Sequence, residues 1–371
     1  MAVTPPSGAF GAIRRGTLPP KIGPGAGTSF DRMDRILRAA TCRCGPLCRG
    51  ARRSLLVSPS AGGQARYAGG MGQAKRFQTG MKRSMAACES CDSPSLADTT
   101  TSPSPNPSPP GQAVRSVKVA VCQIRCADSD VEGNTLRITR AVEEAAAKGA
   151  QIAAFPETVF IGWVNTAAHQ LAQPIPGKFS DVVCRLAKKH RIMISIGLTE
   201  TVQEGIYDSM ILVSSDGEII LKHRKINTMP ELMTPPYLQG RKEDLSAVDT
   251  PLGRVGAMIC ADSFVDEHHE IMALLKPQLL LIPYGWAADK KEWPAHGKKL
   301  EETVSRIAKN VGAGVVGPNL LGEITCGPWK GKTYEGHSVV ADSSGAILAL
   351  GKDNWEEILV VNVPIRPMRT A

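Results

Sequence analysis

The pattern of apolar and polar positions changes along this chain. From residue 116 onward, short apolar runs alternate with amphipathic stretches. About four to eight apolar residues bounded by turn residues predict a buried strand, whereas apolar positions that recur every three or four residues predict a helix. We therefore expect helices at 134–148, 179–190 and 304–311, and strands at 117–124, 151–157, 192–200, 279–283, 313–319 and 358–364.

Two further pairs of apolar runs are joined by tight turns and predict β-hairpins: a DG turn within 207–225 and an SG turn within 335–351. Strands that alternate with helices imply a layered α/β domain, and the hairpins make its sheets mixed rather than wholly parallel. No GxGxxG follows the first strand and no GxxxxGK[ST] occurs, so nucleotide-binding folds lose support. We expect one domain at 116–371.

The chain before this domain has a different composition. Residues 1–91 are rich in Arg, Ala, Ser and Gly and poor in acids, which is typical of an organelle transit peptide. A disordered extension, or a true start at Met71, Met81 or Met85, explains this composition equally well. Residues 92–115 are rich in Pro, Ser and Thr and predict a linker.

Charge and hydropathy indicate which partners to expect. The net charge is +9, but residues 1–88 hold 15 Lys or Arg and two acids, which leaves −4 for residues 89–371. A nucleic-acid-binding core would carry the basic patch itself. A basic tail that binds nucleic acid or an anionic membrane is the alternative to targeting, and the tail has few aromatic residues between its charges. No apolar run approaches the ~20 residues that span a bilayer.

We therefore expect a small-molecule substrate and neither nucleic acid nor membrane as a partner. The expected location is soluble and intracellular: the cytoplasm, or a mitochondrion or plastid if residues 1–91 are a transit peptide. Ten cysteines are scattered along the chain, which is not a disulfide framework and favours a reducing compartment. The spacings CxCxxxC at 42–48 and CxxC at 88–91 match no strong zinc pattern, so no metal site is predicted.

The stretch 251–264, PLGRVGAMICADSF, places a cysteine at the end of a buried strand. Asp262 or Ser263 could cap the helix that we expect in the following DEHHEIMALLK. Cys260 would then lie on a strand-to-helix turn with amide groups directed at its sulfur, which favours the thiolate and a nucleophilic role. The alternative is a small apolar residue at a strand end.

Two more polar residues end apolar strands. Glu157 ends QIAAFPE, and Lys225 ends EIILKHRK. Sites in α/β proteins are built at strand ends, so Glu157, Lys225 and Cys260 would converge if their strands are neighbours in the sheet. Taken singly, Glu157 could be a loop carboxylate and Lys225 part of a solvated run of charge.

The pieces FPET, KHRKIN and GAMICADSF, in this order and spacing, resemble the nitrilase superfamily of carbon–nitrogen hydrolases. The resemblance extends over about residues 117–364. It implies a four-layer αββα sandwich with two mixed β-sheets and a catalytic triad of Glu157, Lys225 and Cys260. It also implies a homodimer or higher homo-oligomer and no metal or organic cofactor.

The resemblance further implies a role for each residue. Cys260 attacks the carbonyl or nitrile carbon, Glu157 transfers protons, and Lys225 with the backbone N–H of Ala261 stabilises the developing charge. A thioester forms and is hydrolysed by water. Glu231, six residues after Lys225, is the candidate for a second carboxylate that many members use to hold the lysine and substrate.

The sequence departs from many members after the nucleophile, where Ala261 replaces an aromatic residue and FVDE replaces FPE. This leaves the substrate open, with Tyr237, Phe264 and Trp286 as candidate substrate-binding residues. We expect hydrolysis of a small amide or carbamoyl compound with release of ammonia or an amine. The alternatives are a nitrilase that converts a nitrile to a carboxylic acid and ammonia, and a catalytically inactive binding or scaffold member of the family.

Overall fold

The computed structural model of the protein describes residues 115–366, so the predictions for residues 1–91 and for nearly all of the linker lie outside the described residues. The helices are α2 (Val131–Ala147), α3 (Ala168–Leu171), α4 (Lys178–His190), α5 (Asp266–Leu274) and α6 (Ala295–Val311). The strands are β1 (Arg115–Gln123), β2 (Ile152–Ala154), β3 (Met193–Val202), β4 (Gly205–Val213), β5 (Ile219–Arg224), β6 (Ala247–Thr250), β7 (Gly253–Ala257), β8 (Leu279–Leu281), β9 (Gly314–Gly317), β10 (Leu321–Glu323), β11 (Thr333–Glu335), β12 (Val339–Ala341), β13 (Ile347–Leu350) and β14 (Glu357–Ile365).

Two six-stranded mixed sheets form the centre of the domain. Their strand orders are β14-β1-β2-β3-β4-β5 and β13-β12-β9-β8-β7-β6, and β10 pairs separately with β11. In each large sheet one run of three strands is parallel, β1 to β3 in the first and β7 to β9 in the second. The remaining pairs are antiparallel.

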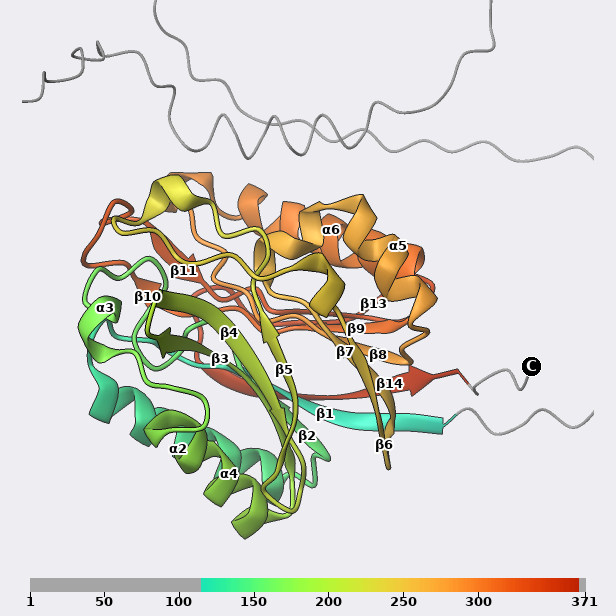
Figure 1. The fold of residues 1–371 in the computed structure, drawn as a ribbon. Coiled ribbons are helices and arrows are strands. Elements are labelled where there is room, and N and C mark those ends of the chain that lie inside the picture. Colours follow the sequence, from blue (N-terminus) through green and yellow to red (C-terminus); the bar gives the residue numbers. More distant parts are fainter. Residues whose placement is uncertain (1–114, 367–371) are drawn as a thin grey trace, which may run out of the picture. The chain divides into compact units, whose positions relative to one another are not determined.

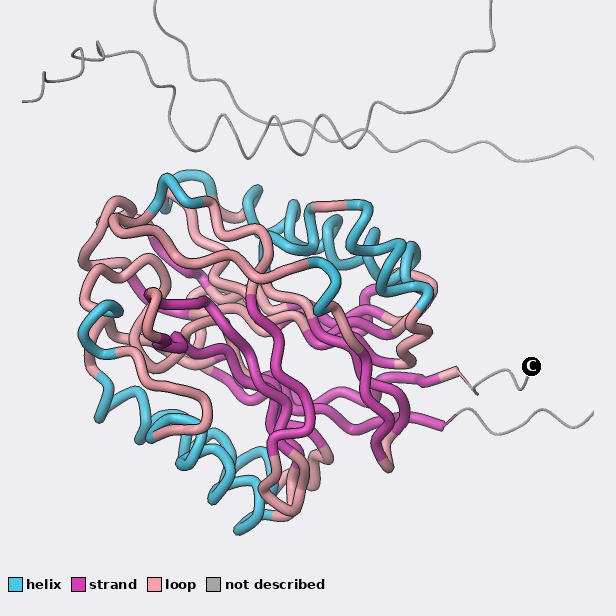
Figure 2. Tube along the Cα trace, viewed as in Figure 1, coloured by secondary structure: helices cyan, strands magenta, loops and turns pink. Residues whose placement is uncertain are grey.

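Helices cover the outer face of each sheet. Figure 1 shows α2 and α4 on one side and α5 and α6 on the other, and Figure 2 shows the strands between these helical layers. One apolar core joins α2 and α4 to the first sheet through residues such as Ile138 and Val183. A second core contains inward residues of both sheets together with Leu300 and Val304 of α6. The predicted four-layer αββα sandwich is therefore confirmed.

The pattern of apolar positions predicted the long elements well and the short ones less well. Each expected strand, helix and hairpin is present. Most ends are displaced by a few residues, but α6 begins at Ala295, nine residues before the expected start at Val304. The pattern did not predict α3, β6, β10 or β11, which have three or four residues each and are too short to show a period.

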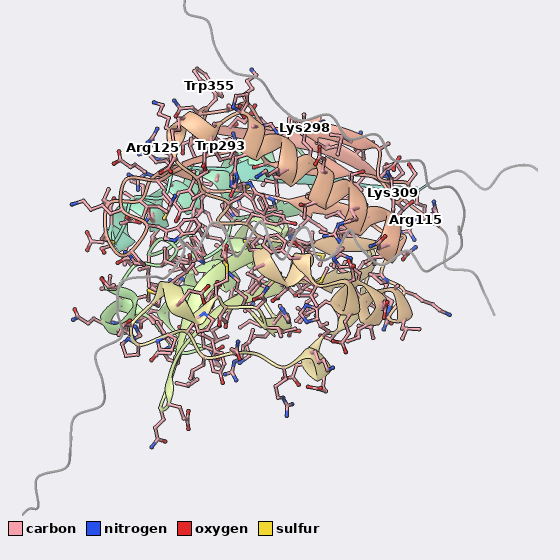
Figure 3. All side chains as sticks on the ribbon, turned by 90° about the horizontal axis from the view of Figure 1, so that it is seen from above. Arg115, Arg125, Trp293, Lys298, Lys309 and Trp355 are labelled. Carbon is pink, nitrogen blue, oxygen red and sulfur yellow. The ribbon has the colours of Figure 1, made fainter. Side chains whose placement is uncertain are left out.

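The outer layers are polar. Figure 3 shows Lys298 and Lys309 projecting from α6 on the outside of the domain. No helix within residues 115–366 has both the length and the apolar composition that crossing a membrane requires.

A close backbone crossing at Gly197 positions the segment that carries Glu157. Beyond β2 the chain runs along β3, where Gly197 N–H donates to the Pro156 carbonyl and Val159 N–H donates to that of Gly197. A Cβ atom on Gly197 would lie 2.6 Å from the Glu157 Cα and 2.7 Å from the Pro156 carbonyl oxygen. Only glycine allows this approach, which carries Glu157 from the end of β2 toward β4.

We predict that Gly197→Ala lowers the free energy of unfolding by about 1–3 kcal/mol, because the added methyl group meets backbone atoms that cannot rotate away. Urea unfolding of the full chain measures this. Gly312→Asn is the matched control, because Gly312 ends α6 in the left-handed region and a Cβ atom there would have nothing within 4 Å. Asparagine tolerates that conformation, so a loss at Gly197 no larger than in this control would contradict the crossing argument.

Candidate active site

Glu157, Lys225 and Cys260 each stand just beyond a strand, but those strands are not neighbours in one sheet. Glu157 follows β2, Lys225 follows β5 and Cys260 follows β7. Strands β3 and β4 separate β2 from β5, and β7 belongs to the other sheet. The expectation of neighbouring strands was therefore wrong. The three residues meet across the interface of two packed sheets, which alternation along one strand cannot reveal.

The side chain of Lys225 joins two buried carboxyl groups. Its ammonium donates a hydrogen bond to Oε1 of Glu157 and another, of 3.1 Å, to Oδ2 of Asp208. All three side chains are at most 1% exposed. The backbone supports this contact, since Lys225 N–H donates to the Asp208 carbonyl at 2.8 Å. The ammonium also lies over the Trp163 ring, 5.3 Å from the ring centroid, so the indole covers another side of the charge.

These charges shift one another's pKa values. Burial by itself lowers the pKa of Lys225, but Glu157 and Asp208 outweigh it and hold that pKa well above its ordinary value. Burial raises the pKa of Asp208 well above its usual range, and the charge of Glu157 raises it further. These shifts favour the charged form of Lys225 and disfavour ionisation of Asp208.

Cys260 begins the short 3-10 helix η3 (Cys260–Phe264) with a positive φ of 40°. A non-glycine residue in this region costs about 1–2 kcal/mol, which the surrounding structure must offset. Its N–H donates to the Pro283 carbonyl at 3.0 Å, and its carbonyl accepts from the Ser263 hydroxyl at 2.5 Å. These bonds hold the turn that presents the sulfur.

The expectation that this turn favours the thiolate was wrong. Burial raises the pKa of the Cys260 thiol well above its ordinary value, and the carboxylate of Glu157 raises it further. The ammonium of Lys225 and the N–H of Gly285, which donates to the sulfur, act in the opposite direction but do not outweigh burial. A raised pKa favours the thiol form, so Cys260 would need a base in order to act as a nucleophile.

Asp262 connects the turn of Cys260 to the strand end of Lys225. Its carboxylate accepts hydrogen bonds from His223 Nε2 at 2.9 Å and from the N–H groups of Ile226, Asn227 and Ile259 at 2.9, 2.8 and 3.1 Å. Burial opposes ionisation, but these donors hold the pKa of Asp262 below its ordinary value. The pair His223–Asp262 thus fastens the two sheets together where Lys225 and Cys260 emerge.

The structure also corrects the predicted helix cap. Helix α5 begins at Asp266, its N-cap residue is Val265, and no side chain caps it. His268 and His269 lie buried on α5, and their rings contact the carbonyls of Asp262 and Ser263 at 2.9 Å. They attach η3 to the helix and do not face the sulfur.

Unpaired polar atoms gather around this cluster. Glu157 Oε2, Asp208 Oδ1 and the Tyr237 hydroxyl are buried without a hydrogen-bond partner within residues 115–366. Buried polar atoms are normally paired, so these free hydrogen-bonding positions make the cluster a candidate binding site. The pKa of Tyr237 is raised by burial and by Asp208, which puts its hydroxyl within electrostatic reach of the site.

The other predicted site residues have varied surroundings. Ala261 is buried directly after Cys260, and Phe264 packs edge-on against Trp286 with ring centroids 5.5 Å apart. The indole N–H of Trp286 donates to the His296 carbonyl at 3.0 Å, so its polar group serves the fold. Their contacts with substrate stay predictions.

Glu231 lies exposed in the 3-10 helix η1 (Pro230–Leu232). The second carboxylate bonded to Lys225 is Asp208. A role for Glu231 in holding substrate stays a prediction. No group of three or more His, Cys, Asp or Glu within residues 115–366 is arranged to hold a metal ion.

Sequence reasoning missed Asp208, the His223–Asp262 pair and Gly285. Asp208 could have been found as the acid inside the apolar run YDSMILV, because an unpaired charge in a buried strand is costly. Gly285 had no signal. A Cβ atom there would lie 2.7 Å from Glu157 Oε2, so glycine allows this segment to approach that oxygen closely.

Comparison with known proteins places the chain in a family. The family model described as carbon-nitrogen hydrolase matches residues 118–370. Among curated relatives, a nitrilase of Paraburkholderia phymatum is 29% identical over 46% of this chain and 56% of its own length. A chloroplastic omega-amidase of Arabidopsis thaliana is 27% identical over 70% of both chains. An N-carbamoylputrescine amidase of Solanum lycopersicum is 26% identical over 69% of this chain and 89% of its own.

Solved structures share the fold. A carbon-nitrogen hydrolase from Helicobacter pylori superposes with a TM-score of 0.59 and 19% identity, over 67% of this chain and 89% of its own. A mutant amidase from Nesterenkonia, with an acetamide moiety covalently attached to its active-site cysteine, gives a TM-score of 0.58 and 20% identity over 69% and 94%. At these identities the likeness concerns the fold.

We predict that Asp262→Asn lowers the free energy of unfolding by about 2–4 kcal/mol, because the amide places donors against donors in a buried site. Urea unfolding at several pH values measures this. Since the folded pKa of Asp262 lies below its unfolded value, its contribution is complete above pH about 4 and is lost as pH falls through the folded pKa.

The difference in the free energy of unfolding between wild type and Asp262→Asn should accordingly become smaller at acid pH. Asp249→Asn is the control, because Asp249 is 68% exposed in its contact with Arg254 and should change stability by less than about 0.5 kcal/mol. A difference that stays constant down to the lowest pH would contradict an ionised Asp262.

Proposed function

The chain belongs to the carbon–nitrogen hydrolase family, and we propose that it cleaves the carbon–nitrogen bond of a small amide or carbamoyl compound through a thioester on Cys260. The observation that carries this proposal is the buried contact of Lys225 with Glu157 beside the sulfur. Acyl transfer needs a nucleophile, a group for proton transfer and a fixed positive charge, and these residue types supply all three.

In the first step the Cys260 sulfur bonds to the substrate carbonyl carbon while its proton moves to Glu157. The raised thiol pKa makes this base necessary, because little thiolate exists beforehand. The electron pair of the carbonyl bond moves to oxygen, where the Lys225 ammonium and the Ala261 N–H stabilise it. Their surroundings are buried, and electrostatic stabilisation is stronger there than in water.

In the second step the tetrahedral intermediate releases nitrogen. The carbon–nitrogen bond breaks, Glu157 returns its proton to the leaving nitrogen, and ammonia or an amine departs from the thioester. A water molecule then gives a proton to Glu157 and attacks the thioester carbon. The carbon–sulfur bond breaks, the sulfur regains the proton from Glu157, and the acid product leaves.

Two observations favour an amide or carbamoyl substrate over a nitrile. The relatives named omega-amidase and N-carbamoylputrescine amidase match 70% and 69% of this chain, whereas the nitrilase matches 46%. Ala261 also places a small side chain beside the nucleophile.

We predict that the purified full chain releases ammonia from at least one member of a panel of short ω-amides, N-carbamoyl amines and aliphatic nitriles. Intact-mass spectrometry run beside the assay should detect an acyl adduct on Cys260. Release from amides or carbamoyl compounds but not nitriles is the expected pattern. Release of ammonia from nitriles alone would show that the nitrilase alternative is correct. No release from any compound, together with an unreactive Cys260, would favour an inactive binding protein.

Cys260→Ala should abolish both release and adduct, because no other described group is placed to attack. Circular dichroism should show an intact fold, since this small buried change costs only about 1–2 kcal/mol. Cys184→Ala on α4 is the matched control, because Cys184 is only partly buried and lies away from the site. A loss of activity in that control equal to the loss in Cys260→Ala would contradict the assignment.

Glu157→Gln should reduce kcat by about 10²–10⁴-fold, because glutamine cannot transfer the proton. Lys225→Met should reduce it by about 10²–10³-fold through loss of positive charge at the oxyanion. Steady-state kinetics on the best panel substrate measure both. A rate near that of wild type in either variant would remove the corresponding residue from the mechanism.

A further inference from the structure

The carboxyl group of Asp208 is the part of the site that the proposed mechanism leaves unused. It lies on β4, faces the interface between the two sheets, and is 1% exposed. Its hydrogen-bond partner is the Lys225 ammonium at 3.1 Å, which also bonds the carboxyl group of Glu157, and its Oδ1 has no partner within residues 115–366. Two buried carboxyl groups therefore share a single cation.

We propose that Glu157 and Asp208 hold a single proton between them, that Asp208 is the neutral member in the resting site, and that it positions both Glu157 and Lys225. This inference rests on the proposed function of Glu157 and Lys225.

The charges around Asp208 support one proton on the pair. The groups that face it are Glu157 beyond β2, Lys225 beyond β5, the Cys260 thiol beyond β7 and the Tyr237 hydroxyl. Of these only Lys225 is a cation. Two ionised carboxylates would therefore leave one uncompensated negative charge in a site closed to water, which is costly. Two carboxyl groups that share one buried cation disfavour each other's ionisation.

The geometry assigns the proton to Asp208 rather than to Glu157. The Lys225 ammonium lies closer to Glu157 than to Asp208, so the stronger ion pair is with Glu157. Asp262, equally buried, shows what an ionised aspartate has here: four donors and no acidic neighbour. Asp208 has a single cationic donor, and it shares that donor with another acid. The raised pKa of Asp208, caused by burial and by Glu157, agrees with this assignment.

A neutral Asp208 has a chemical purpose in the reaction. With one proton on the pair, Lys225 and Glu157 balance each other, and the ammonium can stabilise negative charge as it forms on the substrate oxygen. Ionisation of Asp208 would add a negative charge that opposes both the thiolate and the oxyanion. Asp208 also holds Lys225 in place through their hydrogen bond of 3.1 Å, and Lys225 in turn holds Glu157, whose Oε2 stays unpaired.

Infrared difference spectroscopy tests the protonation directly and without turnover. We expect the full chain at neutral pH to show the C=O stretching band of one protonated carboxylic acid, which disappears in Asp208→Asn. It should disappear equally in Glu157→Gln, because Asp208 would then be the sole partner of Lys225 and would ionise. Asp249→Asn, which removes an exposed carboxylate, should leave the band intact. Two variants keep the test decisive if one of them folds poorly.

The pH dependence of Cys260 alkylation by iodoacetamide supplies a second readout, followed by intact mass from pH about 6 to about 10, around the ordinary thiol pKa. Asparagine mimics a neutral aspartic acid, so Asp208→Asn should react within about threefold of wild type near neutrality. The ratio of variant to wild-type rate should then rise with pH as Asp208 ionises in wild type and slows its alkylation. A purely structural role for Asp208 would leave this ratio flat.

Absence of the acid band in wild type, its persistence in Asp208→Asn, or a rate ratio that is large at neutral pH and does not rise would each overturn the proposal. These outcomes differ from a failure of the proposed function. If Cys260 resisted alkylation and the substrate panel gave no ammonia, the hydrolase mechanism would fall, while the infrared band would still decide the state of Asp208.

Discussion

A buried ammonium held by carboxyl groups is the interaction on which the rest of this structure depends. Lys225 is 1% exposed, and an isolated cation at such depth would cost several kcal/mol. Glu157 forms an ion pair with it and Asp208 accepts a further hydrogen bond from it, but only because the chain places these groups within reach from β2 and β4. The same contact that makes Lys225 tolerable in the interior gives it the fixed position that oxyanion stabilisation needs. Stability and proposed chemistry therefore rest on one cluster.

Two local features bring the residues of this cluster together from separate layers. Gly197 lets the Glu157 segment cross β3 at close range, and Asp262 with His223 fastens the Lys225 strand end to the turn of Cys260. Because the site lies between the two sheets, burial dominates its electrostatics. That burial raises the thiol pKa of Cys260 rather than lowering it, so the sulfur depends on a neighbouring base and not on a helix end. The short η3 turn has too few aligned amides to reverse this effect.

Much of this could be predicted from the order of residues, and the failures have physical causes. The long strands and helices follow from periodicity, and Glu157, Lys225 and Cys260 were identifiable as polar residues at the ends of apolar runs. The idea of neighbouring strands failed because strand order is a tertiary property. Asp208 was not identified from the sequence, because a single acid in an apolar run does not reveal which cation it contacts in the fold. The cap on α5 was misassigned because Asp262 has four stronger donors in space.

The sequence by itself determined the layered α/β class, the family and the three residues on which the proposed hydrolysis rests, because these depend on residue type and local spacing. Only the tertiary structure decided which groups surround them. It brought Asp208 into contact with Lys225, and it raised the thiol pKa of Cys260 through burial. It also placed Asp262 where its hydrogen bonds link the two sheets. The physical reason is that the energy of a charge depends on its nearest partners and on the exclusion of water, and both are properties of packing between segments far apart in the chain.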